Sequence, residues 1–249
     1  TIRGLKVENS GRDLSEQHSG IFLGRDADRA LVEDNELNGN LIGIYVWGPK
    51  DAVVRRNRIT GLKLHRVNAR GNGVQLWRTP GSLVEGNEIS HGRDGIFVTT
   101  SKRNIFRNNR FHDTRFAVHY MYTNDSDVSG NTAISNHVGY ALMYSKGLRV
   151  RNNISRGDRD HGFALNYANT SIFEGNRVEG GGEKCVFIYN SNKNQFRENL
   201  FSGCEIGVHF TAGSERNLIS GNAFVDNRTQ VKYVGTRVLD WSVEGRGNY

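Results

Sequence analysis

The chain has 249 residues, with 33 lysines and arginines against 26 aspartates and glutamates, and a formal net charge of +7. It contains 30 glycines but only 2 cysteines, too few for a disulfide-rich scaffold. No apolar run approaches the roughly 20 residues that a transmembrane helix requires. The length allows a sizeable buried core, and the positive charge suits acidic partners of several kinds.

A repeated motif runs along the whole chain in the form apolar-x-x-Asn-x-apolar. It is clear at Val32-Glu-Asp-Asn35-Glu-Leu37, and an earlier copy from Ile2 to Val7 has Leu5 in place of Asn. The asparagines of the motif are Asn35, Asn57, Asn87, Asn109, Asn131, Asn153, Asn176, Asn199 and Asn222. Their intervals are 22, 30, 22, 22, 22, 23, 23 and 23 residues. An interval that is 22 or 23 residues in all but one case identifies a structural repeat. Val243-Glu-Gly-Arg246 resembles a further copy of the motif.

A second motif precedes each asparagine by 14 or 15 residues and consists of a small residue followed by alternating apolar positions. The first residues of its copies are Gly20, Gly43, Gly73, Gly95, Ala117, Gly139, Gly162, Cys185, Gly207 and Gln230. We call these residues the anchors. Alternation with period two predicts short strands. The frequent glycine at the anchor suggests a corner with unusual backbone angles.

Short strands at this period predict an all-β chain folded as a right-handed parallel β-helix, a solenoid of about ten coils of ~22–23 residues each. Stacked asparagines would form ladders of hydrogen bonds between coils. We expect residues 1–249 to form a single β-helix domain. Both ends have the pattern of mid-solenoid coils, so we expect the chain to be truncated at both ends relative to a longer native chain.

The residues one and three positions after each anchor are apolar in every coil, which places them in the core. Side chains alternate along a strand, so the second and fourth positions should face solvent. The second positions are Phe22, Tyr45, Gln75, Phe97, His119, Ala141, Ala164, Phe187, His209 and Lys232, and the fourth are Gly24, Trp47, Trp77, Thr99, Met121, Met143, Asn166, Tyr189 and Thr211. An outward face this apolar usually marks an interface.

Both methionines of the chain, Met121 and Met143, fall in one outward column on adjacent coils, and His119 shares their face. Two thioethers roughly 5 Å apart beside an imidazole form a soft ligand set. Such a set suits Cu(I) and disfavours hard cations. An alternative is that the methionines only fill a protein interface. His209 lies four coils away, about 19 Å by coil spacing, which is too far to share the metal.

Other candidate residues lie at corners and strand ends. Two long turns, Val7 to Gly20 and Ile59 to Gly73, occur at the same corner. The second contains Lys63, His65, Arg66 and Arg70, which suggests either a basic docking loop or an ordinary surface loop. The remaining expectations are solvated turn positions for His91, His112, His137 and His161, packing at the edge of the core for Tyr122, Tyr144 and Tyr167, and two buried thiols for Cys185 and Cys204.

Several function classes are disfavoured. Polysaccharide cleavage or epimerisation on a β-helix needs clustered carboxylates, and neither outward column contains Asp or Glu. The basic residues do not form one stripe, which disfavours nucleic-acid binding. We therefore expect neither catalytic residues nor a nucleic-acid partner, although a carbohydrate-active β-helix enzyme remains an alternative.

Several stretches resemble the NosD family, over nearly the whole chain. They are Val118-His-Tyr-Met-Tyr122, Gly139-Tyr-Ala-Leu-Met143, Phe187-Ile-Tyr-Asn-Ser191, Ala212-Gly-Ser-Glu215, Gly221-Asn-Ala-Phe224, Gln230-Val-Lys-Tyr-Val234 and Trp241-Ser-Val-Glu-Gly-Arg-Gly-Asn-Tyr249. The resemblance implies a periplasmic β-helix that serves copper-site maturation of nitrous oxide reductase. It also implies a membrane ABC transporter and a copper chaperone lipoprotein as partners.

Together, the resemblance and the soft ligand set suggest transient Cu(I) binding by His119, Met121 and Met143, followed by transfer to nitrous oxide reductase. Docking surface would come from the aromatic residues Trp47, Trp77, Phe97, Phe187 and Tyr189. The alternative from another class is a structural docking scaffold with no metal site. Handling of sulfur species for the reductase is a further possibility that the residues do not address.

Overall fold

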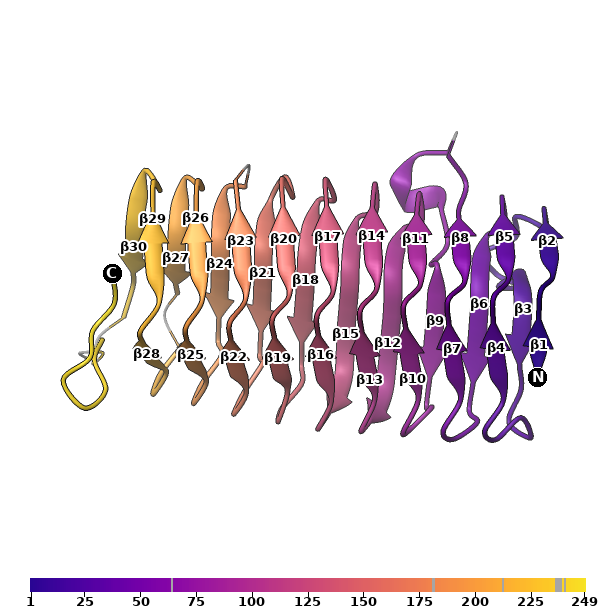
Figure 1. Cartoon of the computed structure of the whole chain (residues 1–249), viewed down its shortest axis with the longest axis horizontal. Helices are drawn as coiled ribbons and strands as arrows, with labels where there is room; N and C mark the ends of the chain where they lie inside the picture. Colours follow the sequence, from indigo (N-terminus) through magenta and orange to yellow (C-terminus); the bar gives the residue numbers. More distant parts are fainter. Residues whose placement is uncertain (64, 181, 212, 236–238, 240) are drawn as a thin grey trace.

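The structure is a computed structural model that describes residues 1–63, 65–180, 182–211, 213–235, 239 and 241–249. In these residues, strands follow one another around three parallel sheets of ten strands each, and each coil adds one strand to every sheet (Figure 1). Connections between neighbouring strands of a sheet are therefore crossovers, which are right-handed in parallel sheets. The predicted right-handed parallel β-helix is confirmed.

The three sheets take their strands in strict rotation. Sheet 1 contains β1 (Ile2–Arg3), β4 (Leu31–Glu33), β7 (Val53–Arg55), β10 (Leu83–Glu85), β13 (Ile105–Arg107), β16 (Asp127–Ser129), β19 (Arg149–Arg151), β22 (Ile172–Glu174), β25 (Gln195–Arg197) and β28 (Leu218–Ser220). Sheet 2 contains β2 (Lys6–Glu8), β5 (Glu36–Asn38), β8 (Arg58–Thr60), β11 (Glu88–Ser90), β14 (Arg110–His112), β17 (Thr132–Ile134), β20 (Ile154–Arg156), β23 (Arg177–Glu179), β26 (Leu200–Ser202) and β29 (Ala223–Val225). Sheet 3 contains β3 (Ser19–Leu23), β6 (Ile42–Trp47), β9 (Val74–Trp77), β12 (Asp94–Lys102), β15 (Phe116–Asn124), β18 (Val138–Met143), β21 (His161–Asn166), β24 (Lys184–Tyr189), β27 (Ile206–Phe210) and β30 (Thr229–Tyr233).

The predicted asparagine ladder stands between sheets 1 and 2 and is almost fully buried. Asn57 shows the arrangement: its backbone N–H and its Nδ2 both donate to Oδ1 of Asn87, at 2.9 and 3.0 Å. The same Nδ2 also donates to the carbonyl of Val32 in the preceding coil, at 3.1 Å. The ladder thus satisfies backbone groups at a corner that β-sheet bonding cannot reach. It confirms the reason inferred for the repeat.

The glycine anchors are required for a different reason from the expected one. They are absent from the residues with a left-handed backbone. Instead, a Cβ added to Gly43 would lie 2.5 Å from the carbonyl oxygen of Gly73 and 2.5 Å from a methyl group of Ile59. The glycines are therefore selected by the close approach of the next coil, and the expectation of unusual backbone angles was wrong.

Both ends of the chain join the repeat in a modified form. Leu5 occupies the asparagine position of the first coil, and its backbone N–H donates to Oδ1 of Asn35 at 3.0 Å. At the other end, Val243 and Arg246 pair with each other in an antiparallel bridge rather than forming a coil strand. Asn248 then continues the ladder, because its Oδ1 accepts the backbone N–H of Asn222 at 3.0 Å. The copy of the motif assigned to Val243 was therefore misplaced.

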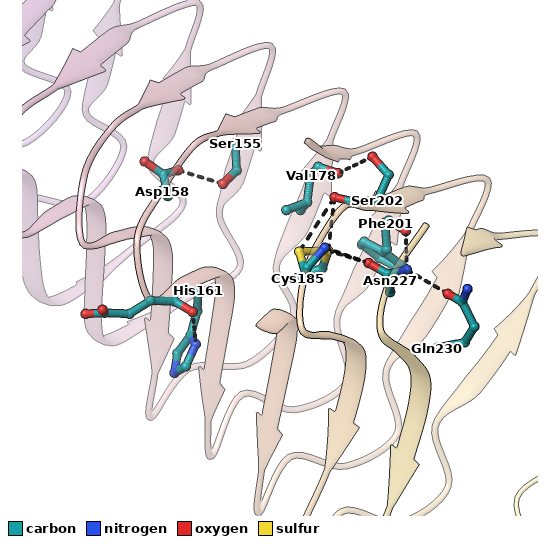
Figure 2. The surroundings of a disulfide bond; sticks show 11 residues. Ser155, Asp158, His161, Val178, Cys185, Phe201, Ser202, Asn227 and Gln230 are labelled. Carbon is teal, nitrogen blue, oxygen red and sulfur yellow. Dashed lines mark hydrogen bonds between the residues drawn. A yellow bond between two sulfur atoms is a disulfide. The ribbon is translucent and has the colours of Figure 1, made fainter. Parts of the chain in front are cut away.

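Cys185 and Cys204 form a disulfide, with their Cα atoms 5.7 Å apart (Figure 2). The expectation of two buried thiols was wrong. Cys185 is an anchor at the start of β24, while Cys204 lies in the turn that enters the next coil. The backbone N–H of Cys204 donates to Oδ1 of Asn227 at 3.0 Å, which holds this turn against the corner. Although Cys204 lies three residues before the next anchor, Gly207, the turn at this corner brings it next to Cys185.

The two long turns lie at the same corner, as predicted, and border a hollow of about 480 Å³. The second turn contains the short 3₁₀ helix η1 (Val67–Ala69) and projects from one edge of the solenoid between β8 and β9 (Figure 1). Leu64 of this turn is outside the described residues. Among those described, no helix combines the length and apolar character needed to cross a membrane.

Candidate functional site

The outer face of sheet 3 has the register that the motif predicts. Phe97, His119 and Ala141 are direct neighbours on β12, β15 and β18, and Thr99, Met121 and Met143 form the next outward column. Two of the outward positions are nevertheless covered. Tyr45 packs in a small apolar cluster with Leu62 of the long turn, and Ala141 is fully buried.

His119 is held by a carboxylate that the motif analysis missed. Its Nδ1 lies 2.9 Å from Oδ2 of Asp94, the residue that precedes the anchor Gly95. Asp94 is fully buried and accepts two further hydrogen bonds from Arg115, from Nε to Oδ1 at 2.9 Å and from Nη2 to Oδ2 at 2.8 Å. The rings of Phe97 and Phe116 lie 5.0 and 4.9 Å from the imidazole. The histidine is thus fixed from several sides.

This network determines which nitrogen of His119 is free. Burial works to raise the pKa of Asp94, but the hydrogen bonds from His119 and Arg115 outweigh it and hold that pKa below its usual range. An ionised carboxylate only accepts hydrogen bonds, so the shared proton belongs to Nδ1. Nε2 is buried and has no hydrogen-bond partner among the described residues. A histidine oriented in this way presents a lone pair to a metal ion.

Met121 and Met143 are neighbours in register on β15 and β18, and both side chains are partly exposed on the outer face. His119 and Met121 are two residues apart on the same strand, which places them on the same face. The structure therefore brings the three predicted ligands to one patch of sheet 3. Two thioethers and one imidazole are soft to borderline donors, and they match Cu(I) rather than Mg²⁺ or Ca²⁺.

Three tyrosines at the ends of the sheet 3 strands form an exposed stack beside the methionines. Tyr122 and Tyr144 stack at 5.0 Å between ring centroids, and Tyr144 and Tyr167 stack at 5.2 Å. Tyr122 is 55% exposed, so the expectation of packing at the core edge was wrong. Tyr189 meets the edge of Tyr167 at 6.4 Å. The result is an aromatic ribbon along the rim of the candidate copper site.

A second aromatic group lies nearer the N-terminus. Trp47 and Trp77 stack at 5.4 Å. Arg25 lies over the first ring at 4.2 Å, and Arg78 lies over the second at 4.5 Å. These cation–π contacts leave charged groups around an apolar centre, which is a common composition of protein interfaces.

The other predicted docking residues are divided between exposed and structural positions. Phe187 lies between the rings of His161 and His209, at 5.4 Å from each. Lys63 and Arg66 are exposed, and His65 is half-buried. Arg70 braces its own turn, because its guanidinium donates to the carbonyls of His65 and Lys63 at 2.8 and 3.0 Å.

The corner histidines are not all isolated. His91 and His112 lie on adjacent coils with their ring centroids 5.7 Å apart, and both approach Asp113. Burial lowers the pKa of His91, against the opposing effect of the Asp113 carboxylate. These two histidines, expected at solvated turn positions, therefore meet at one corner. Because Ser90 pairs with His112 across sheet 2, His91 lies opposite Asp113.

Asp94 could have been found from the sequence by including a third column. Residues directly before the anchors pair with one another across sheet 3, as Asp94 does with Phe116. In the sequence, Asp94 is the only acidic residue that directly precedes an anchor. Simple alternation from the core residues places Asp94 on the inner side of the strand, so it does not indicate the contact with His119.

Comparison with known proteins supports a relationship over the whole chain. The family profile described as "Periplasmic copper-binding protein (NosD)" matches residues 59–249. A protein of Pseudomonas aeruginosa named "Probable ABC transporter binding protein NosD" is 42% identical over 262 aligned positions, which include 100% of this chain and 61% of that protein. The protein of the same name from Stutzerimonas stutzeri is 39% identical, over 100% of this chain and 60% of that protein. The chain therefore spans about three fifths of the length of the curated relatives it matches.

Solved structures show the fold at much lower identity. The A-module of the mannuronan C-5 epimerase AlgE6 from Azotobacter vinelandii matches with a TM-score of 0.62 and 14% identity, over 94% of this chain and 74% of that one. The Dettilon tailspike protein (gp208) matches with a TM-score of 0.59 and 17% identity, over 94% and 46%. These similarities establish a shared β-helix and nothing about activity. The family match and the two relatives establish that this chain belongs to the NosD family, which is described as periplasmic and copper-binding.

Proposed function

We propose that this chain accepts Cu(I) from a copper chaperone lipoprotein at His119, Met121 and Met143 and passes it to nitrous oxide reductase. In this proposal the chain works in the periplasm beside a membrane ABC transporter and performs no chemical conversion. Copper is its cargo. The family description supports binding of copper, and the names of the relatives support an association with an ABC transporter.

The observation that carries the proposal is the orientation of His119. A buried carboxylate holds Nδ1 at 2.9 Å, and Nε2 has no hydrogen-bond partner in the described part of the chain. A buried nitrogen without a hydrogen-bond partner normally lowers the stability of the fold. Its presence on the strand that carries Met121, which pairs with Met143 on the next strand, favours a role as a metal ligand. The carboxylate also fixes the orientation of the ring, as it does in carboxylate–histidine–metal arrangements.

The surroundings of the three ligands suit transfer. The side chain of His119 is 12% exposed, while Met121 and Met143 lie partly open on the outer face. A shallow site of this kind allows an incoming ligand from another protein to replace one donor at a time. The neighbouring tyrosine stack and the pair Trp47 and Trp77 provide aromatic surface on which partners can dock.

The test is an anaerobic titration of this chain with Cu(I) against a chromophoric chelator. We expect one equivalent to bind and the double variant Met121→Leu/Met143→Leu to lose it, because leucine keeps the apolar volume but offers no sulfur donor. His209→Gln is a matched control. This histidine occupies the same outward column about 19 Å away by coil spacing, and its removal should leave copper binding unchanged.

The opposite outcome would favour the scaffold alternative. If the unmodified chain does not compete for Cu(I), or if the double variant binds copper as tightly, the three residues are not the ligands. The exposed aromatic surface would then act only in docking. Capture of nitrous oxide reductase by this chain in the absence of copper would test that role directly.

A further inference from the structure

A second group of potential metal ligands lies away from the soft site, at the corner after sheet 2. His91 directly follows β11, and Asp113 occupies the equivalent position one coil later, directly after His112 at the end of β14. Oδ2 of Asp113 lies 2.8 Å from Nδ1 of His112 and 3.9 Å from Nε2 of His91. One ligand atom from each of the three residues falls within 4.8 Å of the other two.

The distances of 2.8 and 3.9 Å between these ligand atoms lie on either side of the distance between two ligands of one metal ion. Ligand atoms around a tetrahedral ion with bonds of about 2.0–2.1 Å lie about 3.3 Å apart. Small side-chain rotations would bring all three atoms to that separation. The remaining ring nitrogen of His91, Nδ1, is buried and has no hydrogen-bond partner among the described residues.

The chemistry of this group differs from that of the soft site. Two imidazole nitrogens and one carboxylate oxygen are borderline to hard donors, and they favour divalent first-row ions such as Zn²⁺ and Cu²⁺ over Cu(I). The side chains are 24%, 34% and 53% exposed for His91, His112 and Asp113. A bound ion could thus be reached from solvent and keep an open coordination position.

We propose that His91, His112 and Asp113 form a binding site for a borderline divalent cation of the Zn²⁺ and Cu²⁺ class. This site is independent of the Cu(I) site proposed above and does not require it. Among the described residues the group contains no fourth His, Cys, Asp or Glu, so the open position can take water or a side chain from a partner protein.

The long turn between β8 and β9 lies against this corner. Nη1 of Arg70 approaches the carbonyl oxygen of Asp113 at 3.5 Å, and Lys63 and Arg70 are close enough to act electrostatically on His91. These two cations oppose the binding of a third, so we expect weaker binding than three such ligands would give without them. A bound ion would also pull the carboxylate of Asp113 toward His91. Because Arg70 contacts the backbone carbonyl of Asp113, this movement would be transmitted to the long turn.

The experiment uses metal-free chain and Zn²⁺, because Zn²⁺ is redox-silent and is bound in proteins by His, Cys and carboxylate ligands rather than by thioethers. Isothermal titration should give one site. His91→Gln and Asp113→Asn should each weaken binding at least about tenfold, since each removes or weakens one of three donors. His137→Gln is the matched control: this histidine lies one coil further on and outside the group, so its loss should change nothing.

The double variant Met121→Leu/Met143→Leu separates the two proposals. Zn²⁺ binding should be unchanged in it, and Cu(I) binding should be unchanged in His91→Gln. Substitution with Co²⁺ adds a spectroscopic readout, because an ion held by these donors should show visible absorption that His91→Gln abolishes. Absence of Zn²⁺ binding, or equal binding by His91→Gln when thermal unfolding shows that the variant is folded, would overturn the proposal.

Discussion

The exchange Asp94→Asn probes the orientation of His119 without changing the size of the side chain. Asp94 accepts from Nε and Nη2 of Arg115 at 2.9 and 2.8 Å and contacts Nδ1 of His119 at 2.9 Å. An amide has one oxygen and one NH₂ group in place of two acceptors. Either orientation of the amide therefore sets an N–H group against the guanidinium of Arg115.

The two orientations have different consequences for the imidazole. If the NH₂ group replaces Oδ2, it donates to Nδ1 of His119, and the ring proton moves to Nε2, which removes the lone pair needed by copper. If it replaces Oδ1, the histidine keeps its tautomer but loses a charged acceptor. Removal of such supporting partners typically costs 10–100-fold in metal affinity, equivalent to about 1.4–2.7 kcal/mol.

The assay is the chelator competition with Cu(I) under anaerobic conditions, on Asp94→Asn and on Asp127→Asn as a control. Asp127 is also largely buried and pairs with Arg151 at 2.6 Å, but it lies on sheet 1. We expect weaker copper binding only in Asp94→Asn. Equal affinity in the two variants and the unmodified chain would refute the role assigned to the Asp94–His119 pair.

Two further predictions concern the ladders. Asn131→Ala removes Oδ1, the acceptor of both the backbone N–H and Nδ2 of Asn109 at 3.0 Å, and leaves buried groups unpaired. We expect a loss of about 3–5 kcal/mol in the free energy of unfolding, measured by chemical denaturation, and a much smaller loss for the partly exposed control Asn38→Ala. A loss below about 1 kcal/mol for Asn131→Ala would contradict this. Asp158 belongs to a second ladder, in which its Oδ1 accepts the backbone N–H of Asn136 at 2.8 Å. Burial raises the pKa of Asp158. Its charge therefore costs stability at pH 7, and that cost disappears as the pH falls toward the unfolded value of about 3.9. Asp158→Asn should unfold at a higher temperature at pH 7 but not at pH 3.5, and an equal gain at both would argue against a charge effect.

The β-helix could be predicted from the sequence because its stabilising contacts repeat at a constant interval. Asn57 and Asn87 bond to each other although the interval between them is longer than in other coils. Each coil contacts the next at the same register, so the position of a residue within the motif predicts its ladder partner, whatever the length of the intervening turn. The placement of Met121 next to Met143 follows from the same register.

Contacts across corners could not be predicted in this way. The pairing of Cys185 with Cys204, the approach of Asp94 to His119 and the meeting of His91 with His112 join residues from different columns. Their distance depends on the angle through which the chain turns, which no residue interval specifies. The burial of Tyr45 likewise depends on where the long turn folds.

The sequence alone thus determined the solenoid, its core and the column that contains the candidate copper ligands, since alternation and stacking are local and repeat. Only the tertiary structure decided which nitrogen of His119 is free, which carboxylate holds it and which corner residues meet. Those features depend on side-chain directions at corners, where the regular alternation of a strand ends.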